Sequence, residues 1–343
     1  MAYTTINKSA DHFNTKLYTG NSSTLNVTGV GFQPDWVWIK DRTSAGDDHA
    51  LYDAVRGVTK RIRSNQSDAE NTESQGLTAF GTDGFTVGTS GAHNGNGDTF
   101  VSWNWKAGTT SGLSGGTITP SAYSINATAG FGIYKYTGNS TSGATIAHGL
   151  GKVPTMIIVK RLDSNKEWQI YHTSMGNGKW IEFTNGTPQT NTNRWNDTSP
   201  TSTLFYLGND SDVNNSSGTY VAYVFCDVPG YSKMSSYNGN SNSNGTFVYT
   251  GFRPTLLFTK KTSGSYNWSA NDAARDPRNP SEKRLYPSDA AAEATSSNYY
   301  VDFLSNGFKI RTSHASINDD AEYLYMAFGQ TLVGSNNVPS TAR

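Results

Sequence analysis

A short apolar segment that occurs three times along the chain constrains the fold more than any other feature. Each copy begins at a proline and ends at a lysine six residues later, from Pro34 to Lys40, from Pro154 to Lys160 and from Pro254 to Lys260. The run is too short and too continuously apolar for an amphipathic surface helix, so it predicts a buried strand entered at a proline. By register, Trp36, Met156 and Leu256 should be equivalent core positions, and the three lysines should mark where the chain leaves the core.

Two further elements repeat in the same register. A tyrosine followed by glycine, asparagine and serine precedes each proline segment, starting at Tyr18, Tyr136 and Tyr237, and an aromatic run closes each copy at 100–105, 220–225 and 323–328. The period of about 100 to 120 residues is too long for solenoid units, which need neighbours to bury their faces. The repeats are therefore predicted to be domains in tandem, each with its own core.

Composition favours an all-β fold. The chain has 35 Gly, 12% aromatic and only 16% charged residues, as expected for many short strands joined by turns. We expect three tandem antiparallel β-sandwiches spanning 1–112, 113–230 and 231–331, followed by a C-terminal tail at 332–343. The proline-containing second join at 228–230 should hold its neighbours more firmly than the glycine-rich first join at 106–119.

One segment of the first copy has helical spacing, at Leu51, Ala54, Val55, Val58 and Ile62. The corresponding part of the third copy contains Pro277 and Pro280, which an uninterrupted helix would not tolerate. At most one helical turn is therefore expected, followed by a short strand in all three copies, near 60–63, 179–183 and 283–286.

Charge and cysteine content exclude several classes of function. With 27 basic and 27 acidic residues, the chain is not expected to bind nucleic acid or to be drawn to a membrane by charge. No signal peptide or membrane span is predicted, which points to synthesis in the cytosol. The single cysteine, Cys226, allows neither an internal disulfide nor a thiolate metal cluster, so no cofactor is predicted.

No catalytic constellation is found. The six histidines, at positions 12, 49, 93, 148, 172 and 314, show no metal-ligand spacing and are expected to be structural. Glycoside hydrolysis would need two carboxylates across a sugar. The acids at repeated positions, Asp53 and Asp272, instead precede an arginine by three residues, at Arg56 and Arg275, which favours structural ion pairs. The protein is predicted not to be an enzyme.

Two weaker candidates for binding lie in the middle copy. Asp210, Asp212 and Asn214 have the spacing that opens a calcium loop, but the glycine and the glutamate of an EF-hand are missing, so a polar turn is the main expectation. Three tryptophans, Trp168, Trp180 and Trp195, lie among Asn and Thr residues. They could form core or subunit-interface contacts, or stack on the rings of a glycan.

Several segments resemble a family of virion-associated proteins of marine tailed bacteriophages. The resemblance covers nearly the whole chain and is carried by the opening 1–8, by the segments 17–21, 31–40, 51–57 and 148–151, and by Val228-Pro229-Gly230-Tyr231-Ser232. It implies jelly-roll-like domains in a predicted tail-fibre or other virion structural protein, and it assigns no catalytic residues. Synthesis in the host cytoplasm without an export signal fits such a protein.

The expected function is therefore that of a non-enzymatic virion structural protein, tail-associated or fibre-like, that attaches to host-surface glycans. The alternatives are a capsid decoration or cement protein and, less favoured, a glycan depolymerase. Expected partners are other virion proteins, and a closed homo-oligomer is the prior expectation for a virion appendage. Differences between the copies, above all the loops after the three lysines, should carry the function.

Overall fold

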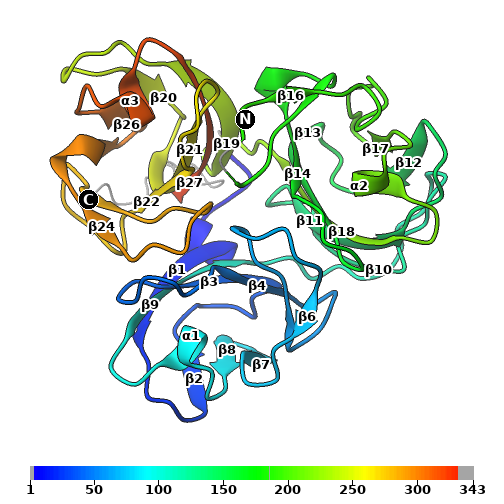
Figure 1. Cartoon of the computed structure of the whole chain (residues 1–343), viewed down its shortest axis with the longest axis horizontal. Helices are drawn as coiled ribbons and strands as arrows, with labels where there is room; N and C mark the ends of the chain where they lie inside the picture. Colours follow the sequence, from blue (N-terminus) through cyan, green and yellow to red (C-terminus); the bar gives the residue numbers. More distant parts are fainter. Residues whose placement is uncertain (1–3, 185, 331–343) are drawn as a thin grey trace.

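The computed structural model describes residues 4–184 and 186–330, and within them the chain is all-β. Each of three repeats has a larger and a smaller antiparallel sheet that pack face to face, so the predicted sandwich class is confirmed. Figure 1 shows the repeats as three lobes around a common centre. The predicted tail at 332–343 lies outside the described residues.

In the first repeat the larger sheet has the order β1-β9-β3-β4 and the smaller sheet the order β2-β8-β7. The elements of this repeat are η1 (Ser9–Asp11), β1 (Phe13–Thr19), β2 (Leu25–Thr28), β3 (Trp36–Asp41), β4 (Ala50–Asp53), β5 (Lys60–Arg61), β6 (Asn71–Thr72), β7 (Leu77–Gly81), β8 (Gly84–Val87), α1 (Gly91–Asn94) and β9 (Thr99–Trp105). The first strand pairs with the last and the second with the next to last, which is a jelly-roll-like pattern.

The second repeat has the sheets β10-β11-β18-β13-β14 and β12-β17, so it carries one extra edge strand. Its elements are β10 (Ala122–Asn126), β11 (Phe131–Thr137), β12 (Ala144–Ala147), β13 (Pro154–Arg161), β14 (Gln169–His172), η2 (Thr173–Met175), β15 (Lys179–Trp180), β16 (Gln189–Thr190), β17 (Leu204–Leu207), α2 (Ser211–Asn214) and β18 (Thr219–Cys226).

The third repeat returns to the sheet orders of the first, β19-β27-β21-β22 and β20-β26-β25. Its elements are β19 (Ser232–Asn238), β20 (Phe247–Tyr249), β21 (Arg253–Lys261), β22 (Ser269–Asp272), β23 (Lys283–Arg284), β24 (Ala294–Thr295), η3 (Ser297–Tyr299), β25 (Val301–Leu304), β26 (Gly307–Ile310), α3 (Ala315–Asn318) and β27 (Glu322–Gln330). The segment with helical spacing forms a turn between β4 and β5, and short strands follow in all three repeats, as the sequence predicts.

The three proline-led segments form β3, β13 and β21, each an interior strand of a larger sheet. The predicted register is confirmed, since Trp36, Met156 and Leu256 pair with equivalent closing-strand residues, namely Trp105, Phe225 and Phe328. Both faces of these strands are buried, which explains why their sequence is continuously apolar instead of alternating.

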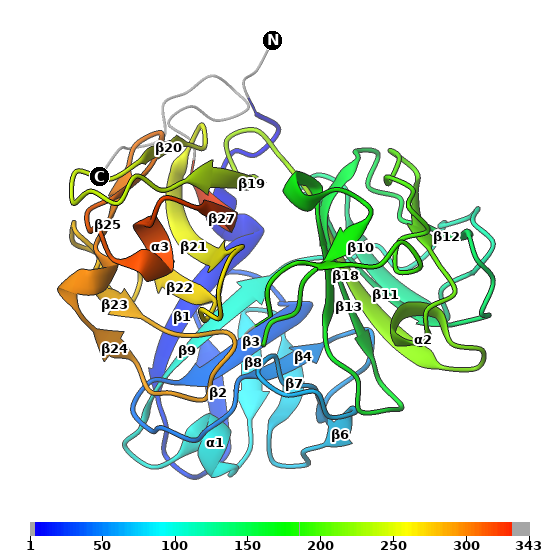
Figure 2. The ribbon, with the colours of Figure 1, turned by 45° about the horizontal axis from the view of Figure 1, so that its top comes forward.

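The two faces of each interior strand enter different cores. Val37 and Ile39 pack inside the first sandwich, whereas Trp36 and Trp38 enter a core that contains residues of all three repeats. In Figure 2 the strands β3, β13 and β21 lie on the sides of their lobes that face the centre. The sequence predicts one core for each repeat. The structure adds a fourth core between them, built from the inward faces of the larger sheets.

The repeated tyrosine, glycine and asparagine motif ties the first strand of each repeat to a short helix. In the second repeat, the Tyr136 hydroxyl donates to the carbonyl of Val213 at 2.7 Å. The Asn214 side chain accepts from the backbone N–H of Asn139 at 2.8 Å and donates to two backbone carbonyls. A Cβ on Gly138 would lie 2.3 Å from a backbone oxygen, so only glycine fits there. The motif is therefore a packing device, repeated around Asn94 and Asn318.

Both joins form backbone hydrogen bonds, and the expectation that the glycine-rich first join is looser stays a prediction. In the first join, Thr109 bridges to Ile125, and the N–H of Thr117 donates to the carbonyl of Thr145. In the second, Val228 bridges to Ser232. The first join thus lies against the second repeat through isolated backbone bridges at Thr109 and Gly116.

Candidate functional site

The repeats meet at three related interfaces, each with a ring nitrogen beside a carbonyl of another repeat. The pairs are Trp168 Nε1 with Arg63 O, Trp268 Nε1 with Glu182 O, and His49 Nε2 with Tyr286 O, each at 2.8 Å. Trp168 is therefore a contact between the first and second repeats. Because its side chain is 0% exposed, its ring is not available to a sugar.

The other two candidate tryptophans lie on the second repeat. Trp195 is buried in the core inside the second sandwich, where its indole donates to the carbonyl of Lys179 at 3.0 Å. Trp180 is half-buried, and the guanidinium of Arg194 lies 4.5 Å from the centre of its ring. Trp195 is thus a core residue, and one face of Trp180 is covered by a cation.

The structure contains both predicted ion pairs, Asp53 with Arg56 and Asp272 with Arg275, and all four side chains are buried. Each aspartate also accepts a hydrogen bond from another repeat: Tyr223 donates its hydroxyl to Asp53 at 2.6 Å, and Trp103 its indole N–H to Asp272 at 3.1 Å. The pairs therefore stabilise the contacts between repeats. The second repeat has His172 and Met175 at the equivalent positions, so its contact with the third repeat is built differently.

The calcium candidates are already engaged by protein groups. Asp210 caps α2 by accepting from the N–H of Asp212, and it pairs with Arg194. Asp212 pairs with Lys166 at 3.0 Å and with Arg194 at 2.7 Å. Asn214 holds the tyrosine motif described above. Among the described residues no group of three or more His, Cys, Asp or Glu side chains could hold a metal ion, and the three residues act as a capped turn.

The sequence places the three repeated lysines where the chain leaves the core, but the structure buries all of them completely. Lys160 donates to the carbonyls of Ser67 and Lys166, while Lys40 and Lys260 each donate to the carbonyl of the next residue. The expectation is wrong for all three lysines, and at Lys160 part of the cover comes from the first repeat, which supplies the carbonyl of Ser67. The loops that follow, predicted to carry function, also contact other repeats, as in the bond from Gly46 N to Ala290 O at 3.1 Å.

Burial lowers the pKa of Lys160 and of Lys260 to about 8, while nearby acids partly oppose the shift. A lysine whose pKa is lower in the folded state destabilises the fold while it is charged. This penalty is lost as pH increases from the folded pKa of about 8 towards the unfolded value of 10.5, so the free energy of unfolding rises over this range. Both groups should make the protein more stable at pH 9 than at pH 7.

We expect the stability of the double variant Lys160→Met, Lys260→Met to depend less on pH between 7 and 9 than that of the unmodified protein, because the variant lacks the two amines whose pKa is lowered. The unmodified protein should gain stability relative to the variant by pH 9, because the native lysines then lose their charge. Thermal denaturation at both pH values measures this, with Lys179→Met, at an exposed position, as the control. A pH-independent difference between the double variant and the unmodified protein would contradict the account.

His93, His172 and Cys226 are buried. Burial lowers the pKa of His93 to about 3 and that of His172 to about 4, so both stay neutral at physiological pH. Burial also raises the pKa of the Cys226 thiol to about 12, which leaves it protonated and a weak nucleophile. None of these three groups is prepared for acid–base or nucleophilic chemistry.

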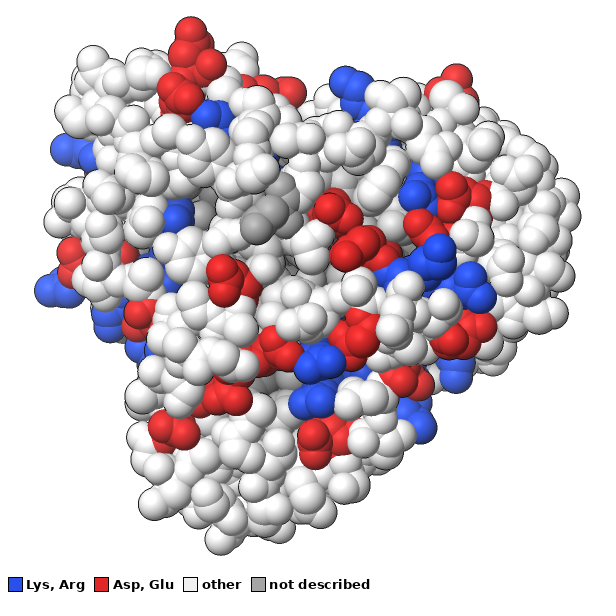
Figure 3. Space-filling model, viewed as in Figure 1, with Lys and Arg blue, Asp and Glu red and all other residues white. Residues whose placement is uncertain are grey.

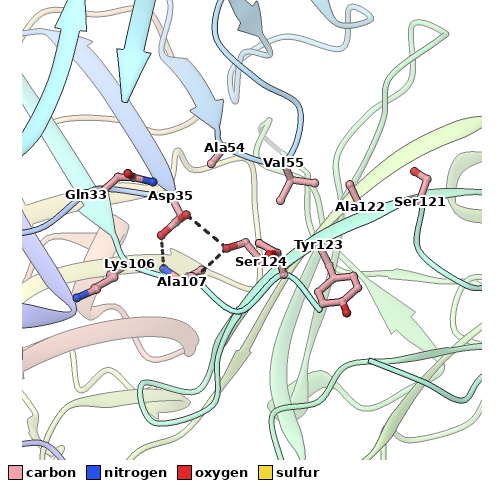
Figure 4. A pocket seen from close by; sticks show the side chains of 12 residues that line it. Gln33, Asp35, Ala54, Val55, Lys106, Ala107, Ser121, Ala122, Tyr123 and Ser124 are labelled. Carbon is pink, nitrogen blue, oxygen red and sulfur yellow. Dashed lines mark hydrogen bonds between the residues drawn. The ribbon is translucent and has the colours of Figure 1, made fainter. Parts of the chain in front are cut away.

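A crevice of about 510 Å³ lies between the first and second repeats. Its first wall comes from the turns around β3 and β4, and its second from the first join and β10, as Figure 4 shows. Polar groups are supplied by Gln33, Asp35, Lys106, Tyr123 and Ser124. A related but smaller pocket of about 230 Å³ lies between the third and first repeats, and no acid lines it.

Asp35 lies at the base of this crevice and is 6% exposed. Its carboxylate accepts from the N–H of Ala107 at 2.7 Å and from the hydroxyl of Ser124 at 3.4 Å, as the dashed lines in Figure 4 indicate. Burial raises its pKa, although these hydrogen bonds and the charge of Lys106 act in the opposite direction. Asp35 is the only carboxylic acid among the described residues that line the crevice.

The site was not among the residues singled out from the sequence, although one signal was present. Asp35 follows the repeated proline, where the second and third copies have Thr155 and Thr255. An acid at a buried repeat position that otherwise carries threonine is a departure from the packing pattern. The crevice itself could not be predicted, because it forms only when two repeats meet.

Some charged side chains gather where two repeats meet. On the face shown in Figure 3 they gather along the seam between the first and second repeats, while the outer surfaces of these two lobes are largely uncharged. Arg63, whose carbonyl accepts from Trp168, pairs with both Asp48 and Asp68 at 2.5 Å. These charges neutralise one another, so this seam does not present a field of one sign.

Comparison with known proteins places the chain in one family. The model of the family described as "Domain of unknown function (DUF7483)" matches residues 8–331, and the chain therefore belongs to this family. A single family model thus spans all three repeats. No curated protein matched the chain, and no solved structure matched it. Among the described residues, no helix has the length and apolar character needed to span a membrane.

Proposed function

We propose that the protein is a non-enzymatic structural component of a bacteriophage virion, tail-associated or fibre-like, that attaches to glycans of the host surface. The observation that carries the proposal is the crevice at Asp35, a concave polar site on a body whose repeats share one core. The motif resemblance to virion-associated proteins of tailed phages supports the virion setting.

The chemistry of the crevice suits binding better than reaction. A carboxylate, a hydroxyl, an amide and a phenol together accept and donate hydrogen bonds, as sugar hydroxyls require. Ala54, Val55 and Ala122 give an apolar wall against which a sugar ring can pack. A glycosidase needs a second carboxylate across the bond, and the described lining residues provide only one acid.

Glycan binding is tested with a pair of matched variants. Ala54→Trp should fill the crevice and reduce retention on an array of bacterial surface polysaccharides by about tenfold or more. Ala273→Trp makes the same change at the equivalent position of the third repeat, beside the pocket without an acid, and should bind as the unmodified protein does. Equal binding by all three proteins, or no binding by any, would contradict attachment through this site.

Capsid decoration is the second candidate, because three related lobes around one centre could match a threefold-symmetric position on a shell. Locating the chain in a density map of the particle separates the two functions. Density on the tail is the result expected from the proposal, and density on the capsomers would replace it with decoration. Incubation with host polysaccharide should leave chain length unchanged, whereas shorter products would indicate a depolymerase.

A further inference from the structure

The outer edge of the third repeat carries an exposed aromatic strand. In β20, Phe247 is 45% exposed and Tyr249 is 55% exposed, while Val248 between them is buried. The equivalent residues of the first repeat are Asn26 and Thr28, which are polar. Two large exposed side chains on one edge strand indicate an interaction site, because such edges pair readily with other strands.

The backbone of this edge is open as well. In the ladder to β26, Ile310 N donates to Thr246 O at 3.0 Å and Thr250 N to Asn306 O at 3.0 Å. Because bonding alternates along an antiparallel strand, the N–H and C=O of Phe247 point away from β26. No hydrogen bond to these two groups is found among the described residues. The carbonyl of Tyr249 is taken by the ammonium of Lys233 at 3.1 Å.

The second repeat shows how an edge of this kind is occupied. Its β12 pairs with β17 in the register in which β20 pairs with β26, so Thr145 is equivalent to Phe247. Thr145 is 9% exposed, because residues 116–118 of the first join lie along it in an extended pairing. The N–H of Thr117 donates to Thr145 O at 2.9 Å, the Thr117 hydroxyl accepts from Thr145 N at 2.8 Å, and Gly116 bridges to Ile146.

We propose that the open edge of β20 binds an extended polypeptide segment of a partner protein by strand addition. The segment would resemble 116–118 of this chain, with small or β-branched residues that bring its backbone close to Phe247. The outward N–H and C=O of Phe247 give the main-chain hydrogen bonds, and the rings of Phe247 and Tyr249 pack against its side chains. This site is separate from the crevice at Asp35.

The test uses a fluorescent peptide with the sequence of residues 109–118, which contains the segment 116–118 that pairs with β12 in this chain. Fluorescence anisotropy should show saturable binding to the full chain. The same peptide with proline in place of Thr117 lacks the donating N–H and should not bind. Phe247→Pro removes the outward N–H at an edge position where proline is tolerated, and it should weaken binding by about tenfold or more.

Two measurements keep the result interpretable. Phe247→Thr retains the N–H and should bind more tightly than Phe247→Pro, and the thermal midpoints of both variants establish that they are folded. The proposal is overturned if the unmodified protein does not bind the peptide, or if Phe247→Pro binds it equally well. A concentration-dependent dimer that Phe247→Pro abolishes would assign the edge to a second copy and would also overturn it.

Discussion

Replacing Trp36 with alanine is expected to lower the free energy of unfolding by about 3 to 5 kcal/mol. The side chain is 0% exposed, and its ring centre lies 4.3 Å from that of Tyr223 and 5.9 Å from that of Phe131, both in the second repeat. It also lies 4.5 Å from the ring of Trp105 in its own repeat. Removing the indole therefore leaves a cavity in the shared core, and the contact between repeats weakens.

Urea denaturation gives the size of this loss, and hydrogen exchange gives its location. In Trp36→Ala, exchange should increase in β11 and β18 of the second repeat, although the substitution lies in the first. Trp195→Ala removes the same kind of side chain from the core inside the second sandwich. The increase in hydrogen exchange should then remain mostly within that repeat. Faster exchange confined to residues 13–105 in Trp36→Ala would mean that the shared core does not couple the repeats.

Replacing Arg56 with methionine is expected to cost about 3 to 5 kcal/mol, because it leaves the buried carboxylate of Asp53 without its cation. The guanidinium also donates to the carbonyls of Leu51 and Lys60 and pairs with Glu70 at 3.0 Å. Its loss therefore frees several acceptors at the contact between the first and second repeats. The free energy of unfolding at neutral pH measures the effect.

The matched double variant separates the charge from the packing. Asp53→Asn together with Arg56→Met removes both charges and should recover a large part of the loss, since an uncharged pair replaces an unpaired buried charge. The second repeat already has an uncharged side chain, Met175, where the first has Arg56. If the double variant were less stable than Arg56→Met alone, the unpaired charge would not be the main cost.

The sequence predicts much of the fold of a single repeat. Proline followed by an apolar run identifies β3, β13 and β21, and repetition gives their register, because each copy supports the others. The same comparison correctly rejects a helix near Leu51, since the third copy contains Pro277 and Pro280. Sequence patterns within one repeat are sufficient to predict those strands whose position depends on that repeat alone.

Contacts between residues distant in sequence account for the expectations that the structure changes. Lys160 is a polar residue at the end of an apolar run, and its ammonium is held by a carbonyl of the first repeat and by one of its own loop. Asp35 becomes part of a pocket only when β10 lies opposite. Asp210 and Asp212 have the spacing of metal ligands, but cations distant in sequence, Arg194 and Lys166, engage them. Spacing along the chain carries no information about these partners.

The central claim is that the three repeats form one body through a shared core, and calorimetry of the unmodified chain tests it most directly. The account predicts a single unfolding transition whose calorimetric and van't Hoff enthalpies are equal, because no repeat can unfold without exposing the shared core. Two or three resolved transitions, or a calorimetric enthalpy two to three times the van't Hoff value, would show that the repeats unfold independently and would contradict it.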